Sequence, residues 1–190
     1  MSKRMLKDER REQLLSIAVS IIKNRGAEAL TLATVAEQAG VTKPVAYNHF
    51  ENKENLLKQI YQGIDNRLID SIQIAKESSS QSITDLVSIL CESYVDCMLV
   101  NGEIYGLIIA ALKCYPNNVE LSKNIQDFFV GAYSDIFQLP ISDANHQNRL
   151  KLIAIYGIIE SVGEAVISGH VPRDIALAYL KEEVYRIIIK

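Results

Sequence analysis

The chain has 190 residues, 48% of them hydrophobic, which is enough for one large core or two small ones and excludes a disordered chain. Its net charge of −3 would argue against a nucleic-acid partner if the charge were spread evenly. Only four prolines interrupt a sequence rich in helix formers, and its β-branched residues recur with helical rather than alternating periodicity. We therefore expect an all-α fold without β-strands.

The charge is uneven along the chain. Residues 1–60 hold 10 Lys and Arg against 7 Asp and Glu, whereas residues 61–190 hold 10 against 16. This asymmetry favours a basic module that meets phosphate groups and an acidic module that does not. A solvated basic face is the alternative reading, because the excess is small.

The cysteines and the apolar runs exclude several other classes of protein. The three cysteines lack the close paired spacing of metal and redox sites, so we expect buried thiols and no cofactor. Charged residues at 7–11 follow the Lys3-Arg4 start directly, which predicts no secretory signal. The most apolar run, residues 152–167, contains two glutamates and is short for a membrane span. We expect a cytoplasmic protein with no membrane partner.

In chain order, residues 1–7 are either a disordered terminus or a basic arm that approaches phosphate groups. A helix is expected over residues 8–25. Its apolar residues Leu14, Ala18 and Ile22 recur on one face, which can pack beneath the segment that follows.

Residues 31–57 have the pattern of a helix-turn-helix. Thr31 can cap a helix that continues to about Ala39. Gly40 then ends this helix through a left-handed turn, and Val41 can fill the junction between two crossing helices.

The second helix of this motif is expected at about residues 43–49. Thr42 stands where it can cap the helix, and Pro44 lies near the first helical position, where a missing N–H costs nothing. Two short helices that cross at such a turn can place the second one in the major groove of DNA.

The second helix carries side chains suited to DNA. Lys43 can reach a phosphate or a guanine edge, and Asn48 can pair bidentately with adenine. Short helix-turn-helix corners also occur in proteins that never bind DNA, so the spacing alone leaves the function open. The candidate DNA contacts are Thr31, Thr42, Lys43, Pro44, Tyr47, Asn48, His49 and, at the positive end of the next helix, Lys53.

A wider set of residues points to a known family. It comprises Leu14, Ala18 and Ile22 in the first helix, Gly26 behind it, the run Val41-Thr42-Lys43-Pro44, and Tyr47, His49, Phe50, Lys53 and Leu56. With these residues, the segment of roughly residues 10–60 resembles the TetR family of transcriptional regulators. The resemblance implies a three-helix DNA-binding head, here residues 1–52, and a helical ligand-binding and dimerisation domain, here residues 53–190. It also implies operator DNA, a small-molecule inducer and a second copy of the chain as partners.

The next helix is expected to be long. Apolar residues recur with helical spacing from Lys53 until the serines at residues 78–80, which predicts about 25 helical residues. A helix that begins in the head and ends in the second domain can transmit a displacement, because packed helices shift as units. A merely long helix is the alternative.

The middle of the chain predicts further helices and a candidate ligand site. One helix is expected to end near Gly102, a second to cover residues 103–114, and a third to cover residues 118–138. Facing apolar stripes with a few polar tips can form a ligand cavity, although most such stripes are ordinary core. The candidate ligand residues are Leu68, Tyr94, Met98, Tyr105, Phe129, Tyr133 and Glu160. Glu160 either contacts a cationic ligand or an interface, or forms an ordinary exposed polar edge together with Glu164.

The last two helices are expected at residues 143–168 and from Pro172 onward. They are more apolar than one core requires, and Gly157 and Gly163 would allow another helix to approach closely. The resemblance implies that these helices form the dimer interface, and burial within one subunit is the alternative. The candidate interface residues are Ile155, Ile159, Val162, Val166, Ile175 and Tyr179.

These features together predict a repressor that a small, largely apolar ligand releases from a palindromic operator. Ala33 and Thr34 stand where some tetracycline-type repressors carry a base-reading arginine, so a different operator is expected. The alternatives are a helical enzyme or small-molecule carrier with an accidental corner motif, and an architectural DNA binder without a ligand. Because the sequence contains no recognisable Ser/His/Asp or Cys/His set, we expect no enzyme.

Overall fold

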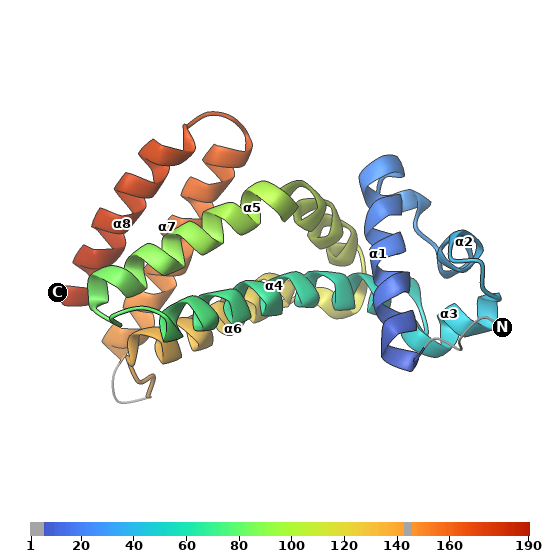
Figure 1. The fold of residues 1–190 in the computed structure, drawn as a ribbon, viewed down its shortest axis with the longest axis horizontal. Helices are drawn as coiled ribbons and strands as arrows, with labels where there is room; N and C mark the ends of the chain where they lie inside the picture. Colours follow the sequence, from blue (N-terminus) through green and yellow to red (C-terminus); the bar gives the residue numbers. More distant parts are fainter. Residues whose placement is uncertain (1–5, 143–145) are drawn as a thin grey trace. The chain divides into compact units, whose positions relative to one another are not determined.

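The structure of the protein, a computed structural model, describes residues 6–142 and 146–190. Residues 1–5 of the predicted arm and the predicted helix start at Asp143 lie outside these residues, whereas Lys7 of the arm already belongs to the first helix. The described part is all-α and contains no β-strand, as the sequence predicts (Figure 1). Its elements are α1 (Lys7–Arg25), η1 (Ala27–Ala29), α2 (Leu32–Gln38), α3 (Lys43–Phe50), α4 (Lys53–Glu77), α5 (Ile83–Lys113), η2 (Pro116–Asn118), α6 (Leu121–Phe137), α7 (His146–Ile167) and α8 (Arg173–Ile189).

The helices form two compact units that do not follow the chain order. The first contains the chain up to Ile64 together with Ile104–Asn118, and the second contains Asp65–Glu103 together with Val119–Lys190. Both α4 and α5 therefore contribute residues to each unit. The functional boundary that we expect after residue 52 remains a prediction.

The core of the first unit forms around α1. Leu14, Ala18 and Ile22 are buried, as their spacing predicts, and so are Val35 of α2 and Phe50 of α3. Burying the Leu, Ile, Val and Phe side chains among these stabilises the fold by about 1.5–3 kcal/mol each. The short helices α2 and α3 would be marginal alone, so this shared core holds them in place.

Helix α4 confirms the prediction of a long helix. It runs through 25 residues from Lys53 to Glu77 and ends at the serines. The Asn52 side chain accepts a hydrogen bond from the Asn55 N–H at 2.8 Å, which caps its first turn. Its apolar stripe includes the buried residues Leu56, Ile60 and Ile72.

Helix α5 corrects the prediction of two helices. The chain does not leave the helix at Gly102 but continues for 31 residues from Ile83 to Lys113. A Cβ atom at Gly102 would overlap Cδ1 of Ile167, and one at Gly163 would overlap Sδ of Met98. The two glycines thus let side chains of α5 and α7 approach closely, whereas a Cβ at Gly157 would meet nothing within 4 Å.

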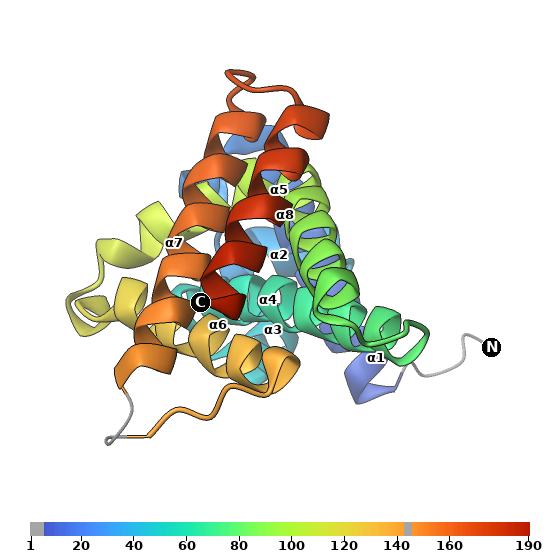
Figure 2. The same ribbon diagram turned by 90° about the vertical axis from the view of Figure 1, so that its left-hand side faces the viewer.

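In the second unit α7 and α8 lie side by side (Figures 1 and 2). Leu152 of α7 and Leu180 of α8 are fully buried. Arg173 at the start of α8 pairs with Asp96 of α5 at 2.6 Å. Helix α5 is long and apolar enough to cross a membrane by length and composition, a test that core helices of other folds also pass. Its ion pair with α8 fits a helix packed in a bundle.

The prediction of three buried thiols is only partly right. Cys91 is buried, Cys97 is half-buried and Cys114 is exposed. Cys114 directly follows Lys113, the last residue of α5, and is exposed to solvent in the turn before Pro116. Burial raises the pKa of the Cys91 thiol to about 12, so this side chain behaves as a small apolar group.

Candidate nucleic-acid interface

The helix-turn-helix forms as the sequence predicts at its first cap and its turn. The Thr31 hydroxyl oxygen accepts the Thr34 N–H at 3.0 Å, and Thr34 Oγ1 accepts the Thr31 N–H at 3.0 Å. Gly40 has φ +66°, and the Val41 N–H donates to the Ala36 carbonyl at 3.0 Å. This left-handed turn directs the chain from α2 into α3.

The prediction that the Thr42 side chain caps α3 is wrong. Thr42 occupies the N-cap position, but its side chain makes no capping hydrogen bond. Pro44 at the second helical position has no N–H to donate, and the Val45 N–H donates to the Thr42 carbonyl at 3.0 Å. The Thr42 hydroxyl is therefore left exposed on the outer surface of the motif.

One face of α3 is exposed and carries the candidate base contacts. Ala46 and Phe50 are buried beneath it, whereas Lys43, Pro44, Tyr47 and Asn48 are exposed. Tyr47 is a large aromatic residue with 49% of its surface exposed. An exposed helical face of this composition can enter the major groove of DNA.

Lys53 makes a contact that sequence reasoning missed. Its ammonium group donates a hydrogen bond to the Ala27 carbonyl at 2.7 Å and so ties the first turn of α4 to η1. The partner lies 26 residues away, and no local signal predicts it. A phosphate contact by Lys53 remains a prediction, and this structural contact exists alongside it.

The basic start of α1 was predicted only in part, since the expected basic arm includes Lys7 but not Arg10 or Arg11. The pKa of His49 lies below its usual value because of burial and then of the positive charges on Lys7, Arg11 and Arg10, while Asp8 raises it. These charges therefore lie near the end of α3. The only sequence signal was their spacing, since residues 7, 10 and 11 share one face of a helix.

An aromatic cluster lies within the second unit and contains several of the candidate ligand residues. The Phe129 ring centroid is 5.5 Å from that of Tyr94, 6.0 Å from that of Tyr133 and 5.6 Å from that of Tyr156. The Tyr94 hydroxyl donates to Glu160 Oε2 at 2.6 Å. Sequence reasoning missed Tyr156, although it precedes Glu160 by one helical turn.

The other candidate ligand residues lie elsewhere. Tyr105 belongs to the first unit, where its ring packs edge-on against Tyr61 at 6.3 Å. Met98 faces Gly163, and Leu68 is buried in the second unit. The structure thus joins Tyr94, Phe129, Tyr133 and Glu160 into one cluster and places Tyr105 outside it.

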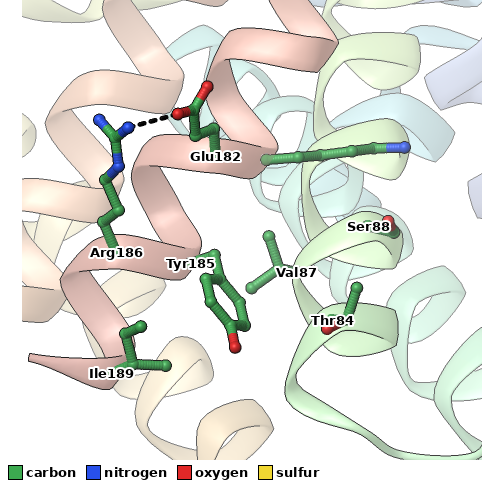
Figure 3. Close-up of a pocket in the computed structure, with 8 residues that line it drawn as sticks. Thr84, Val87, Ser88, Glu182, Tyr185, Arg186 and Ile189 are labelled. Atoms are coloured by element: carbon green, nitrogen blue, oxygen red, sulfur yellow. Dashed lines mark hydrogen bonds and ion pairs between the residues drawn. The ribbon is translucent and has the colours of Figure 1, made fainter.

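Two open grooves in the second unit are lined by other residues. Figure 3 shows the first, of about 480 Å³, in which Tyr185 of α8 faces Thr84 and Val87 of α5. The second, of about 610 Å³, includes Asp127 and Phe128 of α6. None of the candidate ligand residues lines either groove.

The candidate interface residues differ in their exposure. Ile155, Ile159 and Val166 are buried within one copy of the chain, so their apolar character is explained without a partner, and Val162 is half-buried. Ile175 and Tyr179 of α8 are 59% and 51% exposed. On α7 and α8, sequence reasoning missed three further large exposed apolar residues, which are Leu150, Tyr185 and Ile189.

This fold and the exposed face of α3 define a DNA-binding protein of the helix-turn-helix class. Residues 14–60 match the family model described as bacterial regulatory proteins, tetR family. This segment of the chain therefore carries the DNA-binding domain of the TetR family of transcriptional regulators.

Known relatives agree with this assignment. The transcriptional activator FasR of Mycolicibacterium smegmatis is 26% identical over 163 residues, which cover 85% of this chain and 73% of FasR. The transcriptional repressor KstR2 of Rhodococcus jostii is 31% identical over 88 residues, which cover 46% of this chain and 43% of KstR2. The structure of a TetR-like regulator from Rhodococcus sp. RHA1 has the same fold, with a TM-score of 0.66, 19% identity and coverage of 96% of this chain and 97% of that one.

Proposed function

We propose that the protein is a cytoplasmic repressor that binds a palindromic operator as a homodimer and is released by a small, largely apolar ligand. The observation that carries this proposal is the exposed face of α3, where Lys43, Tyr47 and Asn48 project from a helix held by the buried Ala46 and Phe50. A helix held in this way can read base edges without ordering itself first.

The basic start of α1 supports the proposal. Lys7, Arg10 and Arg11 lie near His49 at the end of α3. Phosphate contacts from such residues would set the position of the recognition helix on the duplex, while α3 reads the bases.

The outer faces of α7 and α8 support the homodimer. Ile175, Tyr179 and Ile189 are exposed along α8. On α7, Gly157 adjoins open space, so the backbone of a second helix could approach it closely. A two-fold dimer would place the two copies of α3 roughly 34–36 Å apart, or one turn of DNA, and so requires a palindromic site.

The direction of regulation is the part of the proposal with least support from relatives, since FasR is named an activator and KstR2 a repressor. Repression needs only that the bound dimer block the polymerase, with no further surface for an activating contact. We therefore infer repression as the simpler mechanism.

The experiment that tests the proposal is selection of DNA from a random pool by the purified protein. We expect a single enriched palindrome, and a reporter promoter carrying it should be less active when the protein is present. No enrichment at low salt, where phosphate contacts are strongest, would refute DNA recognition. Enrichment of a site without two-fold symmetry would refute the dimer, and a more active reporter would refute repression.

A further inference from the structure

A carboxylate lies among aromatic rings in the second unit. Tyr94 of α5 is buried and donates its hydroxyl hydrogen to Glu160 of α7, which is half-buried. Phe129 of α6 stacks on Tyr156 of α7, with 22° between the ring planes. Three helices therefore contribute to one cluster, which consists of Tyr94, Phe129, Tyr133, Tyr156 and Glu160.

The Tyr133 hydroxyl in this cluster lacks a partner. Tyr133 is 0% exposed, and no hydrogen bond from the described residues reaches its hydroxyl oxygen. Burying a hydroxyl without a partner destabilises the folded protein, so such a group rarely persists unless something else supplies its hydrogen bond. A molecule from outside the chain can supply the missing hydrogen bond.

The charges around the cluster indicate the sign of that molecule. Burial is the main cause that raises the pKa of Tyr94, Tyr133 and Tyr156, and the negative charge of Glu160 raises all three further. Asp65, a buried carboxyl group of the same unit, also raises the pKa of Tyr133 and Tyr156. A second anion placed here would be repelled, whereas a cation would be attracted.

We propose that the ligand of this unit is an amphiphilic cation, with a protonated amine or amidine attached to an apolar aromatic body. Its N–H groups donate to the Glu160 carboxylate and to the Tyr133 hydroxyl oxygen. The rings of Phe129 and Tyr156 contact its body, and aromatic faces attract its charge. This inference rests on the proposed function, because it names the ligand class for the same regulator, and it disfavours ligands that carry a carboxylate or phosphate.

The test uses the full-length protein and three compounds that share one aromatic body. Calorimetry should measure the affinities of 1-naphthylmethylammonium, the neutral 1-naphthylmethanol and the anionic 1-naphthylacetate. We expect the ammonium compound to bind about 10-fold or more tightly than the alcohol, because one desolvated ion pair contributes about 1.4 kcal/mol or more. The carboxylate compound should bind most weakly.

Two variants and one control assign the effect to the cluster. Glu160→Gln should abolish the preference for the ammonium compound. Glu164→Gln removes the same charge from an exposed position one turn along the same helix and should leave the preference intact. Tyr133→Phe should weaken binding of the ammonium compound about 5-fold or more, yet leave the free protein as stable as before or more stable, since it removes an unpaired hydroxyl. A purely structural role for Tyr133 would not combine these two results.

Equal affinities for the three compounds, or binding of none of them, would overturn the inference, and so would equal effects of Glu160→Gln and Glu164→Gln. Failure of the proposed function gives a different pattern. A protein that prefers the ammonium compound but selects no DNA would refute the DNA-binding function alone, whereas one that selects DNA without this preference would refute the ligand class alone.

Discussion

Lys43 and Asn48 lie on the exposed face of α3 and are the residues that we expect to read bases. Lys43→Ala or Asn48→Ala should relax the preference at one position of the operator, at a cost of about 1–3 kcal/mol for a lost bidentate contact. Tyr47→Phe should weaken all sequences similarly, because a phosphate contact carries no sequence information. Competition binding against a set of single-base operator variants measures both effects. An unchanged preference in both alanine variants would show that other residues read the sequence.

His49 predicts a dependence of DNA affinity on pH. In the free protein, burial and the charges of Lys7, Arg11 and Arg10 hold its pKa below the usual 6.5, against the opposite effect of Asp8. A nearby phosphate would raise this pKa, so DNA binding would take up a proton, and operator affinity should rise as pH falls through the pKa of the DNA-bound state. The gain in affinity should level off below the lower pKa of the free protein, where His49 is protonated in both states. Operator titrations between pH 5.5 and 8 should show an affinity that rises as pH falls, and His49→Gln should remove this dependence. An unchanged pH dependence of operator affinity in the variant would mean that His49 stays far from phosphate.

At the scale of the helices, the contact between α5 and α7 depends on glycine. Gly102→Ala would gain about 1 kcal/mol of helix propensity but would drive its Cβ into Ile167, and overpacking typically costs about 1–3 kcal/mol. Because Ile167 is β-branched and adjusts poorly, we expect a net loss of stability, measured as a lower urea midpoint. Gly106→Ala is the control on the same helix, since its Cβ would meet nothing within 4 Å and the change should stabilise. Equal midpoints in the two variants would argue against the close contact.

These helices also show how far a sequence can predict a structure. The bounds of α1 and α4 were predictable because local signals end them, a glycine at φ +79° after α1 and a serine run after α4. Gly102 was misread because a glycine ends a helix or permits a close contact according to what packs against it, and Ile167 lies 65 residues away. The exposed face of α3 could be predicted from the spacing of its residues. The Lys53 contact with Ala27 and the place of Tyr156 in the cluster depend on the tertiary fold.

At the scale of the whole molecule, Gly157 provides a test of the dimer. Gly157→Ala should stabilise a single copy by up to about 1 kcal/mol, because its Cβ enters open space on a helix. If a second copy packs there, the same methyl group should weaken the dimer, and sedimentation at several concentrations should show more monomer than in the wild type. Ala154→Gly, one turn earlier on the exposed face, is a control that adds no atoms. A wild-type protein that sediments as a monomer, or a Gly157→Ala dimer of unchanged affinity, would exclude this part of the proposed interface.

The last prediction concerns the communication between ligand and DNA. Helix α4 contributes residues 53–64 to the first unit and residues 65–77 to the second, so a shift of this one helix would affect both. At its first turn, Lys53 holds it to the Ala27 carbonyl near the helix-turn-helix. A ligand can release DNA only through its different affinities for the two conformations.

We expect saturating 1-naphthylmethylammonium to weaken operator binding by about 5- to 150-fold, the effect of a coupling of about 1–3 kcal/mol. Because such coupling is reciprocal, operator DNA should weaken binding of the ammonium compound by the same factor. Lys53→Ala removes the hydrogen bond between α4 and η1. The variant should bind the ammonium compound normally, but the compound should weaken its operator binding by a smaller factor than in the wild type. Because this factor compares operator affinities within the same variant, it is unaffected by any phosphate contact that the substitution removes. If the compound binds equally well to the free and the DNA-bound protein, α4 carries no signal between ligand and operator, and the repressor responds only to its own abundance.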